Sequence, residues 1–305
     1  MSDSLLMVYN VSGSVALECR QIKFKYEKEI QGLIESNMEQ FFGVRLLQRE
    51  YCITEGRMDS IGIDENNSPV IFEYKLNENQ NVINQGLFYL DWLLDHKGNF
   101  TLLVQEKFGQ EVARKIDWSQ PALICVARDF TRYDLHAIKQ IERNIRLVRY
   151  SLLENKILIL EHLNILKGKM DSKRRGQGEI VNEDEGYKAN VHLDNLNKAS
   201  EQIKNIYQTL CDYIDELGDD ITSSQQKFYL AYKRLRNFAC IIVQQKRVIV
   251  NLRLDPSQEP IIEDFSFDMS NKGHYGTGDY RLSIKNLDDV DRALPFIKKA
   301  YEQSS

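Results

Sequence analysis

The amino-acid sequence predicts an α/β protein in two parts, a mixed sheet flanked by helices followed by a small α+β domain. In the first half, a segment with helical spacing precedes three strand-like runs, and helices and strands then alternate. In the middle of the chain, residues 167–189 lose almost all apolar side chains. We therefore expect a first domain over residues 1–166, a polar linker over 167–192 and a second domain over 193–305.

The first expected helix, at about 26–42, carries apolar residues such as Ile30, Ile34 and Met38 at helical spacing, and Gly43 follows it. The run 64–69 is rich in turn-forming residues, which indicates a hairpin. Strands are expected at 44–51, 57–63, 70–75, 122–127, 146–150 and 156–163, and further helices at about 79–96, 105–116 and 135–141.

The second domain is expected to begin with a helix at about 193–216, followed by a segment at 225–234. Strands at 239–244, 248–254 and 280–284, a closing run at 265–268 and a helix at 287–301 complete it. The glycine-rich run 273–279 is compatible with an anion-binding nest, but a tight connection between strands is favoured.

Composition excludes several classes of protein. Of the 305 residues, 42% are hydrophobic, which is enough for folded cores, and the net charge of −5 argues against coating nucleic acid through bulk charge. The five cysteines are odd in number and never in CxxC spacing, which argues against a disulfide framework or a zinc ribbon. No apolar run reaches the length of a membrane helix and no signal peptide is visible, so we expect a cytoplasmic protein without membrane contact.

The residues that indicate chemistry lie on the predicted hairpin. Side chains alternate along a strand, so Glu73 and Lys75 share one face and Asp59 on the neighbouring strand can lie opposite Glu73. Two carboxylates, the main-chain carbonyl of Tyr74 and water molecules are ligands that Mg²⁺ accepts. A bound divalent ion suits hydrolysis of a phosphodiester. Lys75 can orient the attacking water, help remove its proton or stabilise the charged transition state, and the sequence leaves these roles open.

Three short motifs together resemble the PD-(D/E)XK nuclease superfamily, and most closely the catalytic domain of NucS or EndoMS-type DNA endonucleases. They are Arg57-Met58-Asp59, Ile71-Phe72-Glu73-Tyr74-Lys75 and Gln85-Gly86-Leu87-Phe88-Tyr89. The likeness is specific over residues 26–95 and looser to about 163, and Met58 stands where the family has its proline. The sequence from Leu217 onward resembles an uncharacterised domain that recurs behind such nuclease domains.

The resemblance implies a restriction-endonuclease-like fold, DNA as substrate, and Mg²⁺ as cofactor with Mn²⁺ able to replace it. It also implies an acidic residue early on the first helix, where Glu27 is the best match and Glu29 the fallback. In this interpretation Asp59 and Glu73 bind the metal with the Tyr74 carbonyl, Lys75 serves the nucleophilic water and Glu27 supports a metal or base. Gln85 positions the site, and Arg57 and Tyr89 contact the substrate.

Each of these residues also has an ordinary structural interpretation. The hairpin face can simply be solvated, and Gln85 and Tyr89, four apart on a helix, can be a surface pair or a tyrosine packed in the core. Glu29, Glu35 and Glu39 suit a solvated helix face as well as Glu27 does. None of the five histidines shows a metal-binding spacing, and we assign none of them to zinc.

Basic residues offer two candidate contacts with phosphates. The run at 167–175 suits a sequence-independent contact with nucleic acid, but a solvated linker is favoured. A second group can line a DNA-facing surface and consists of Arg128, Arg132, Lys139, Arg143, Arg146 and Arg149.

The function we expect is a metal-dependent endonuclease that hydrolyses DNA in repair, restriction or defence. A homodimer is one arrangement that would let two nicking sites make a double-strand break. The alternatives are a catalytically silent nucleic-acid-binding or regulatory protein on the same fold, and a nuclease switched on by a ligand of the second domain.

Overall fold

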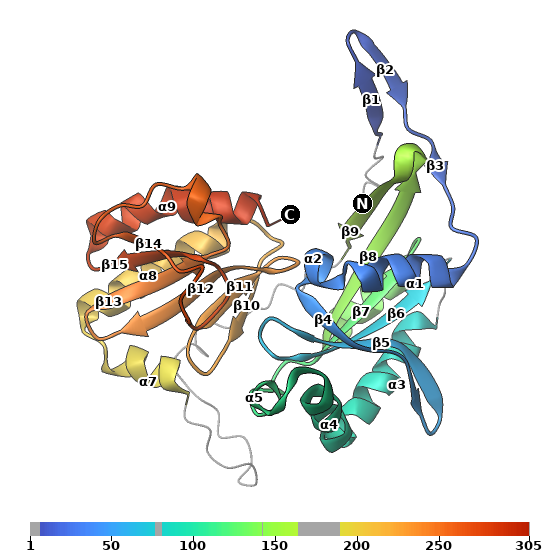
Figure 1. The fold of residues 1–305 in the computed structure, drawn as a ribbon, viewed down its shortest axis with the longest axis horizontal. Helices are drawn as coiled ribbons and strands as arrows, with labels where there is room; N and C mark the ends of the chain where they lie inside the picture. The colour runs from blue at the N-terminus through green and yellow to red at the C-terminus, as the bar shows by residue number, and fades with distance from the viewer. Residues whose placement is uncertain (1–6, 77–80, 142, 164–189, 305) are drawn as a thin grey trace. The chain divides into compact units, whose positions relative to one another are not determined.

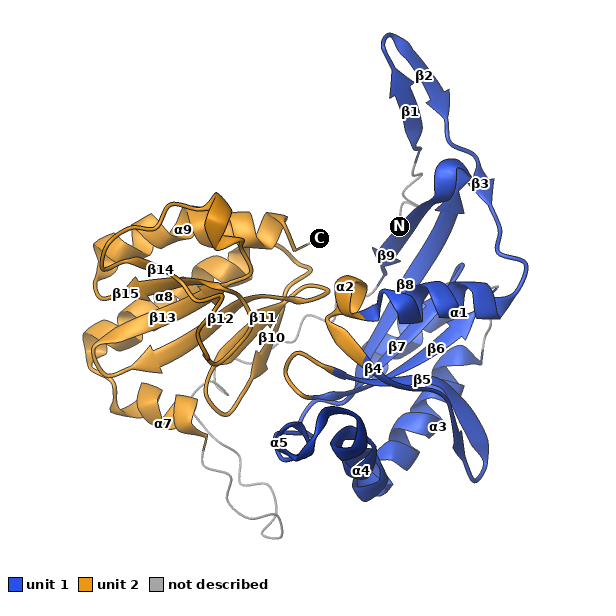
Figure 2. Ribbon diagram, in the orientation of Figure 1, with its two compact units in different colours: residues 1–38, 46–63, 68–164 blue, residues 39–45, 64–67, 165–305 orange. Residues whose placement is uncertain are grey.

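A computed structural model describes residues 7–76, 81–141, 143–163 and 190–304 (Figure 1). The chain forms two compact units, and the second takes in residues 39–45 and 64–67 besides 165–305 (Figure 2). The linker expected at 167–192 lies outside the described residues as far as 189, and its last residues belong to a helix that begins at Val191. None of the helices within these described ranges combines the length and apolarity needed to span a bilayer.

The first unit is built on a mixed seven-stranded sheet in the order β3-β8-β7-β6-β5-β4, with β9 also paired to β8. Strands β6, β7 and β8 are parallel, while β5 with β6, β3 with β8 and β9 with β8 are antiparallel. The predicted mixed sheet is confirmed. The strand bounds are β3 Gln21–Ile22, β4 Val44–Ile53, β5 Gly56–Asp64, β6 Pro69–Lys75, β7 Ala122–Ala127, β8 Asn144–Leu153 and β9 Ile157–His162.

Helices cover both faces of this sheet. Ser60 Oγ donates to Glu35 of α1 and lies 3.3 Å from Tyr74 Oη, whereas Ile71 clusters with Val82 and Leu90 of α3. Because side chains alternate along a strand, α1 and α3 pack on opposite faces. The helix bounds of the first unit are α1 Glu27–Ser36, α3 Val82–Asp95, α4 Lys97–Phe108, α5 Gln110–Ala113 and α6 Arg132–Ala137, with 3₁₀ turns at Ile138–Gln140 and Glu154–Lys156. Helix α2, Met38–Phe42, belongs to the second unit from residue 39 on.

Two local expectations were wrong, and one element was not expected. The single helix expected at 26–42 is interrupted at Asn37, where α1 ends with non-helical backbone angles (φ −127°, ψ 17°). The helix expected at 105–116 begins earlier, at Lys97, and is interrupted at Gly109, where φ is +87°. A separate two-stranded sheet of β1 (Tyr9–Ser12) and β2 (Val15–Glu18) precedes β3 and was not expected.

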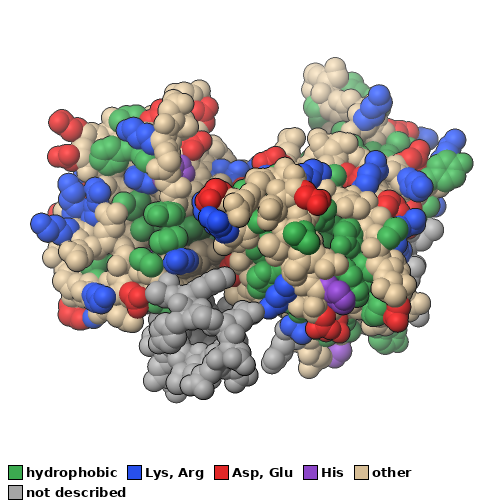
Figure 3. All heavy atoms as spheres, turned by 60° about the horizontal axis from the view of Figure 1, so that its bottom comes forward, with side chains coloured by type: hydrophobic (Ala, Val, Ile, Leu, Met, Phe, Trp, Pro, Cys, Tyr) green, Lys and Arg blue, Asp and Glu red, His purple; other side chains and the backbone are tan. Residues whose placement is uncertain are grey.

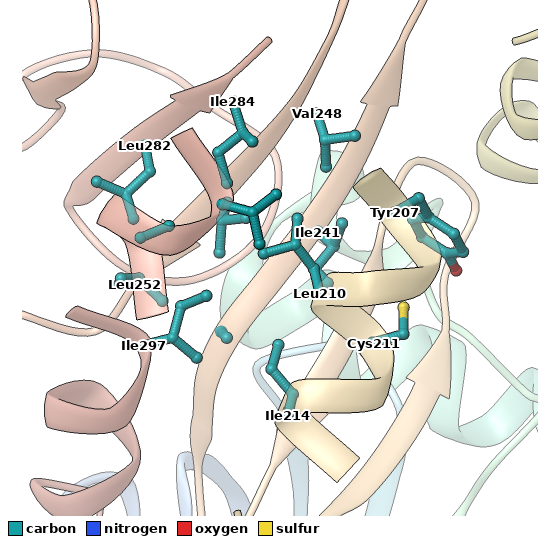
Figure 4. Packing of buried hydrophobic residues seen from close by; sticks show 14 of the residues in the cluster. Tyr207, Leu210, Cys211, Ile214, Ile241, Val248, Leu252, Leu282, Ile284 and Ile297 are labelled. Atoms are coloured by element: carbon teal, nitrogen blue, oxygen red, sulfur yellow. The ribbon is translucent and has the colours of Figure 1, made fainter. Parts of the chain in front are cut away.

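The second unit holds a six-stranded antiparallel sheet in the order β10-β11-β12-β13-β15-β14. Helices α8 and α9 pack on one face, where Leu210, Ile214, Ile241, Leu282 and Ile297 interdigitate (Figure 4). The bounds are α7 Val191–Lys198, α8 Glu201–Glu216, β10 Thr222–Gln225, β11 Leu230–Lys233, β12 Asn237–Gln244, β13 Arg247–Leu252, Pro256–Gln258 (3₁₀), β14 Ser266–Asp268, β15 Tyr280–Ile284 and α9 Leu287–Glu302.

Two features of this unit refine the sequence interpretation. Ser200 caps α8 by accepting a hydrogen bond from the main-chain N–H of Ile203, so the helix expected at 193–216 is two helices. The glycine-rich run 273–279 packs closely on the sheet, since a Cβ at Gly278 would lie 2.4 Å from the Leu252 carbonyl and φ there is +109°. The Thr277 N–H donates to Cys240 Sγ, which favours a tight connection over an anion nest.

Candidate active site

The candidate site begins with two carboxylates on adjacent strands. Pairing of Ser60 with Phe72 in the antiparallel β5–β6 ladder sets Asp59 beside Glu73. The Asp59 N–H donates to Glu73 Oε1 over 3.3 Å, and the Tyr74 N–H donates to Asp59 Oδ2 over 2.9 Å. Each carboxylate therefore accepts a main-chain hydrogen bond from the opposite strand, which fixes the two side chains next to each other.

Burial makes this pair electrostatically costly. Glu73 is 0% exposed, and within the described ranges its Oε2 has no hydrogen-bond partner. Burial, with repulsion from Asp59 second, raises the pKa of Glu73 to about 9. Burial also raises the pKa of Asp59, against the opposing effects of the Tyr74 N–H and Lys75. At neutral pH the pair therefore retains a proton unless a cation takes its place.

The donor atoms suit a hard divalent cation. Within the described part of the chain, no three His, Cys, Asp or Glu side chains surround a common metal position. A cation would therefore draw on Asp59, Glu73, a main-chain carbonyl such as that of Tyr74, and water, which is the mixed oxygen set that Mg²⁺ accepts. Such an ion would neutralise the second charge of the pair and supply a partner for Glu73 Oε2.

Lys75 and Glu27 lie at the end of the same strand. Lys75 Nζ is 3.5 Å from Glu27 Oε1, and Glu27 Oε2 accepts a hydrogen bond from the Leu76 N–H over 3.2 Å. The side chain of Lys75 is 14% exposed and that of Glu27 39%. Glu29, the fallback candidate, instead accepts from the main-chain N–H groups of Lys25 and Tyr26 at the start of α1. Of the two acidic candidates, Glu27 is thus the one that contacts Lys75 within the described residues.

Gln85, Tyr89 and Arg57 form a separate group at the start of β5. Gln85 Nε2 donates to Tyr89 Oη, which also accepts from the Arg57 N–H over 3.3 Å. A Cβ at Gly56 would lie 2.9 Å from this tyrosine, so glycine is needed for the ring to pack there. The exposed Arg57 side chain pairs with Glu50. In the described part of the chain, none of the three hydrogen-bonds to the carboxylate pair.

Sequence reasoning missed a polar stripe on α1. Glu27, Gln31 and Glu35 are four residues apart and so share one face of the helix. Gln31 Nε2 donates to the Asp59 carbonyl over 3.2 Å, and Glu35 Oε1 accepts from Ser60 Oγ over 2.7 Å. The side chain of Glu35 is only 5% exposed, so assigning it to a solvated helix face was wrong. The i, i+4, i+8 spacing was the available signal.

Two of the arginines considered for contact with DNA lie against acidic or aromatic side chains. On the face drawn in Figure 3, basic and acidic side chains are interspersed. Of the arginines proposed for a DNA-facing surface, Arg149 pairs with Asp129 and Glu161, and Arg132 lies over the Tyr133 ring. The basic run at 167–175 lies outside the described residues.

Comparisons with known proteins cover both parts of the chain. The family described as Domain of unknown function (DUF5655) matches residues 194–304, which confirms an uncharacterised domain in this part of the chain. A Haemophilus influenzae protein described as uncharacterized is 30% identical over 292 residues, covering 93% of this chain and 95% of that protein.

Two solved structures share a smaller part. One is a repair endonuclease from Pyrococcus abyssi, 20% identical with a TM-score of 0.29, covering 43% of this chain and 50% of that one. The other is an EndoMS–dsDNA complex, 19% identical with a TM-score of 0.29, covering 43% and 47%. This chain spans about half the length of those proteins, and at these TM-scores we draw no conclusion from them.

Proposed function

This chain belongs to the same family as the Haemophilus influenzae protein, and we propose that it is a metal-dependent endonuclease that hydrolyses phosphodiester bonds in DNA. The observation that carries the proposal is the buried pair of Asp59 and Glu73. Among the residues that the structure describes, Glu73 Oε2 has no hydrogen-bond partner, and Lys75 lies on the same strand as Glu73. A structural pair of carboxylates would normally be hydrogen-bonded or paired with a cation. This pair is held in place by main-chain groups, and the nearby charge of Lys75 does not outweigh its burial, because the pKa values of both carboxylates remain raised.

Asp59 and Glu73 would hold Mg²⁺ or Mn²⁺ together with the carbonyl of Tyr74. When bound, such an ion lowers the pKa of a coordinated water and neutralises charge on the phosphate. Lys75 provides a second positive charge, which can orient the water and stabilise the additional negative charge of the transition state. Glu27 keeps the Lys75 ammonium at the end of β6, because it contacts both that ammonium and the next main-chain N–H.

Hydrolysis bonds the water oxygen to phosphorus and breaks the bond from phosphorus to a sugar oxygen. The attacking water loses a proton and the departing sugar oxygen gains one, so the step needs no oxidant or co-reactant. Gln85 and Tyr89 would act at a distance by fixing the start of β5, two residues before Asp59. The exposed guanidinium of Arg57 would contact a DNA phosphate, since arginine matches phosphate oxygens geometrically.

The test is cleavage by the purified full-length chain. Plasmid, linear, mismatched and single-stranded DNA are incubated with Mg²⁺, Mn²⁺ or EDTA, beside Asp59→Asn and Lys75→Ala variants with unchanged circular dichroism. Asp91→Asn, a change at an exposed residue of α3, is the matched control. We expect cleavage by wild type and by the control, and its loss in EDTA and in both site variants. DNA binding without cleavage in every metal would instead identify a catalytically silent binding protein.

A further inference from the structure

A cavity of about 110 Å³ lies beside the candidate active site in the first unit. Its walls come from β3 and the residues after it, from the residues that follow β6 and β7, and from β8. The residues that matter for its chemistry are Ile22, Lys23, Phe24, Leu76, Arg128 and Tyr150.

The cavity is one residue away from Lys75. Lys75 pairs with Ala127 in the parallel β6–β7 ladder, so Leu76 and Arg128 follow directly on neighbouring strands. Tyr150 Oη donates to the Leu76 carbonyl over 3.0 Å, and the Leu76 N–H donates to Glu27 Oε2. Strands advance by about 3.3 Å per residue, so a group in the cavity would lie within one nucleotide of a phosphate at Lys75.

Arg128 gives the cavity a free cation. It is half-buried, and within the described ranges no hydrogen bond or ion pair joins its side chain to another residue. Arg149, the ladder partner of Ala127 on β8, is by contrast paired with Asp129 and Glu161. Lys23 is exposed at the same cavity and adds a second positive charge. A guanidinium kept partly out of water without a carboxylate suits a phosphate, whose oxygens it can bind in a bidentate manner.

Apart from Gln21, the remaining residues of the wall are mainly apolar. The rings of Phe24 and Tyr150 lie 5.7 Å apart at 59°, and Ile22 and Leu76 add aliphatic surface. An apolar cavity of about 150 Å³ accepts benzene, so 110 Å³ suits a group of about the size of a furanose ring and excludes a whole nucleoside. The chemistry required is therefore a small ring with an apolar face, attached to an anion.

We propose that this cavity binds one sugar–phosphate unit of the DNA strand, next to the phosphate that is cleaved. Arg128 binds its phosphate, and Phe24 and Ile22 contact the sugar. The proposal rests on the proposed function, because it assigns a subsite to the same substrate. Neither group of contacts reads a base, so the cavity contributes affinity that is independent of sequence.

The test measures DNA binding in the full-length Asp59→Asn protein, which is expected to bind without cutting. Arg128→Ala, Arg128→Lys and Phe24→Ala are compared on two duplexes of unrelated sequence over a salt series by fluorescence anisotropy. The control is Arg114→Ala, which removes an exposed arginine directly after α5. We expect Arg128→Ala to weaken binding roughly tenfold on both duplexes and to lower the salt slope by about one, with most affinity retained in Arg128→Lys. Phe24→Ala should weaken binding without changing the slope.

Equal affinities for Arg128→Ala and Arg114→Ala would overturn the proposal. If the otherwise wild-type chain still cleaves DNA in that case, the proposed function stands and only the subsite is lost. A titration with deoxyribose 5-phosphate tests whether the cavity binds a free sugar phosphate instead of a DNA strand. Saturable binding that needs Arg128, with DNA affinity unchanged by its removal, would identify a site for a free sugar phosphate and contradict the assignment to a DNA strand.

Discussion

Two fully buried polar side chains, one in each unit, differ in their hydrogen-bond partners. Asn251 on β13 donates to the Tyr275 carbonyl over 2.7 Å and accepts from Arg281 Nε over 2.9 Å. Glu73 on β6 is equally buried, yet it lies against a second carboxylate and one of its oxygens has no partner in the described ranges. The first arrangement stabilises a sheet, and the second costs stability.

The difference indicates where a ligand belongs. Buried polar groups in folded proteins nearly always find partners, and clusters with shifted pKa values occur mainly at functional sites. The second unit satisfies Asn251 with its own residues. In the first unit, Oε2 of Glu73 lacks a hydrogen-bond partner among the described residues, and we propose that a cation from solution supplies that contact.

The largest expected effect is that of Glu73→Gln. It should lower cleavage at least about a thousandfold, since a site that holds a catalytic cation contributes several kcal/mol to the transition state. The same change should raise the melting temperature in EDTA at pH 8, because the amide removes a buried charge and can donate to Asp59. Glu111→Gln, at an exposed residue of α5, should leave both quantities unchanged. A lower melting temperature with cleavage retained would mean that Glu73 is structural.

Asn251→Leu should have the reverse pattern. The change leaves the Tyr275 carbonyl without its donor and the Arg281 Nε–H without its acceptor. We expect this loss to lower the free energy of unfolding by about 2–3 kcal/mol. Urea denaturation measures this loss, with Gln208→Leu on the exposed side of α8 as control. Metal affinity should be unchanged in molecules that remain folded. A stability equal to that of the control would remove the contrast between the two units.

The free energy of unfolding should depend on pH through the titration of Glu73. Its pKa is about 9 in the folded protein and near 4.5 when unfolded, so the unfolded chain binds fewer protons between these values. Stability contributed by this group is therefore complete below pH 4.5 and is lost as the pH rises toward 9. Thermal melts in EDTA should show a larger fall for wild type than for Glu73→Gln. Parallel curves would contradict the raised pKa.

A smaller effect is expected from the stripe on α1. Gln31→Met keeps the length of the side chain but removes the hydrogen bond to the Asp59 carbonyl, so the carboxylate pair should be less precisely held. We expect a decrease of roughly tenfold in kcat and a few-fold loss of metal affinity, measured against Lys28→Ala on the same helix. A change in stability alone, with both constants intact, would limit this residue to a packing role.

The sequence predicted some regions to the residue and missed others for physical reasons. The buried strands 122–127 and 280–284 have the predicted bounds. The first is a continuous apolar run and the second alternates apolar and polar residues, and both patterns are typical of strands. The strands Tyr9–Ser12 and Val15–Glu18 are exposed on both faces, so they carry no buried alternation that a sequence could reveal.

The site shows the same division. Strand alternation was enough to place Asp59 beside Glu73. The contacts of Gln31 and Glu35 were not predictable from residue type, because glutamine and glutamate on a helix are usually solvated. The packing of α1 on the sheet, against β6, brings these two side chains into contact with Asp59 and Ser60 of β5.

The most direct test of the central claim is calorimetric titration of the full-length protein with Mn²⁺ near pH 7 in two buffers of different ionisation enthalpy. A cation that replaces the shared proton of Asp59 and Glu73 must release it to the buffer. We predict release of about one proton per bound ion in wild type, with both binding and release lost in Glu73→Gln. Binding without proton release, or binding that persists unchanged in Glu73→Gln, would show that the buried pair is not the metal site.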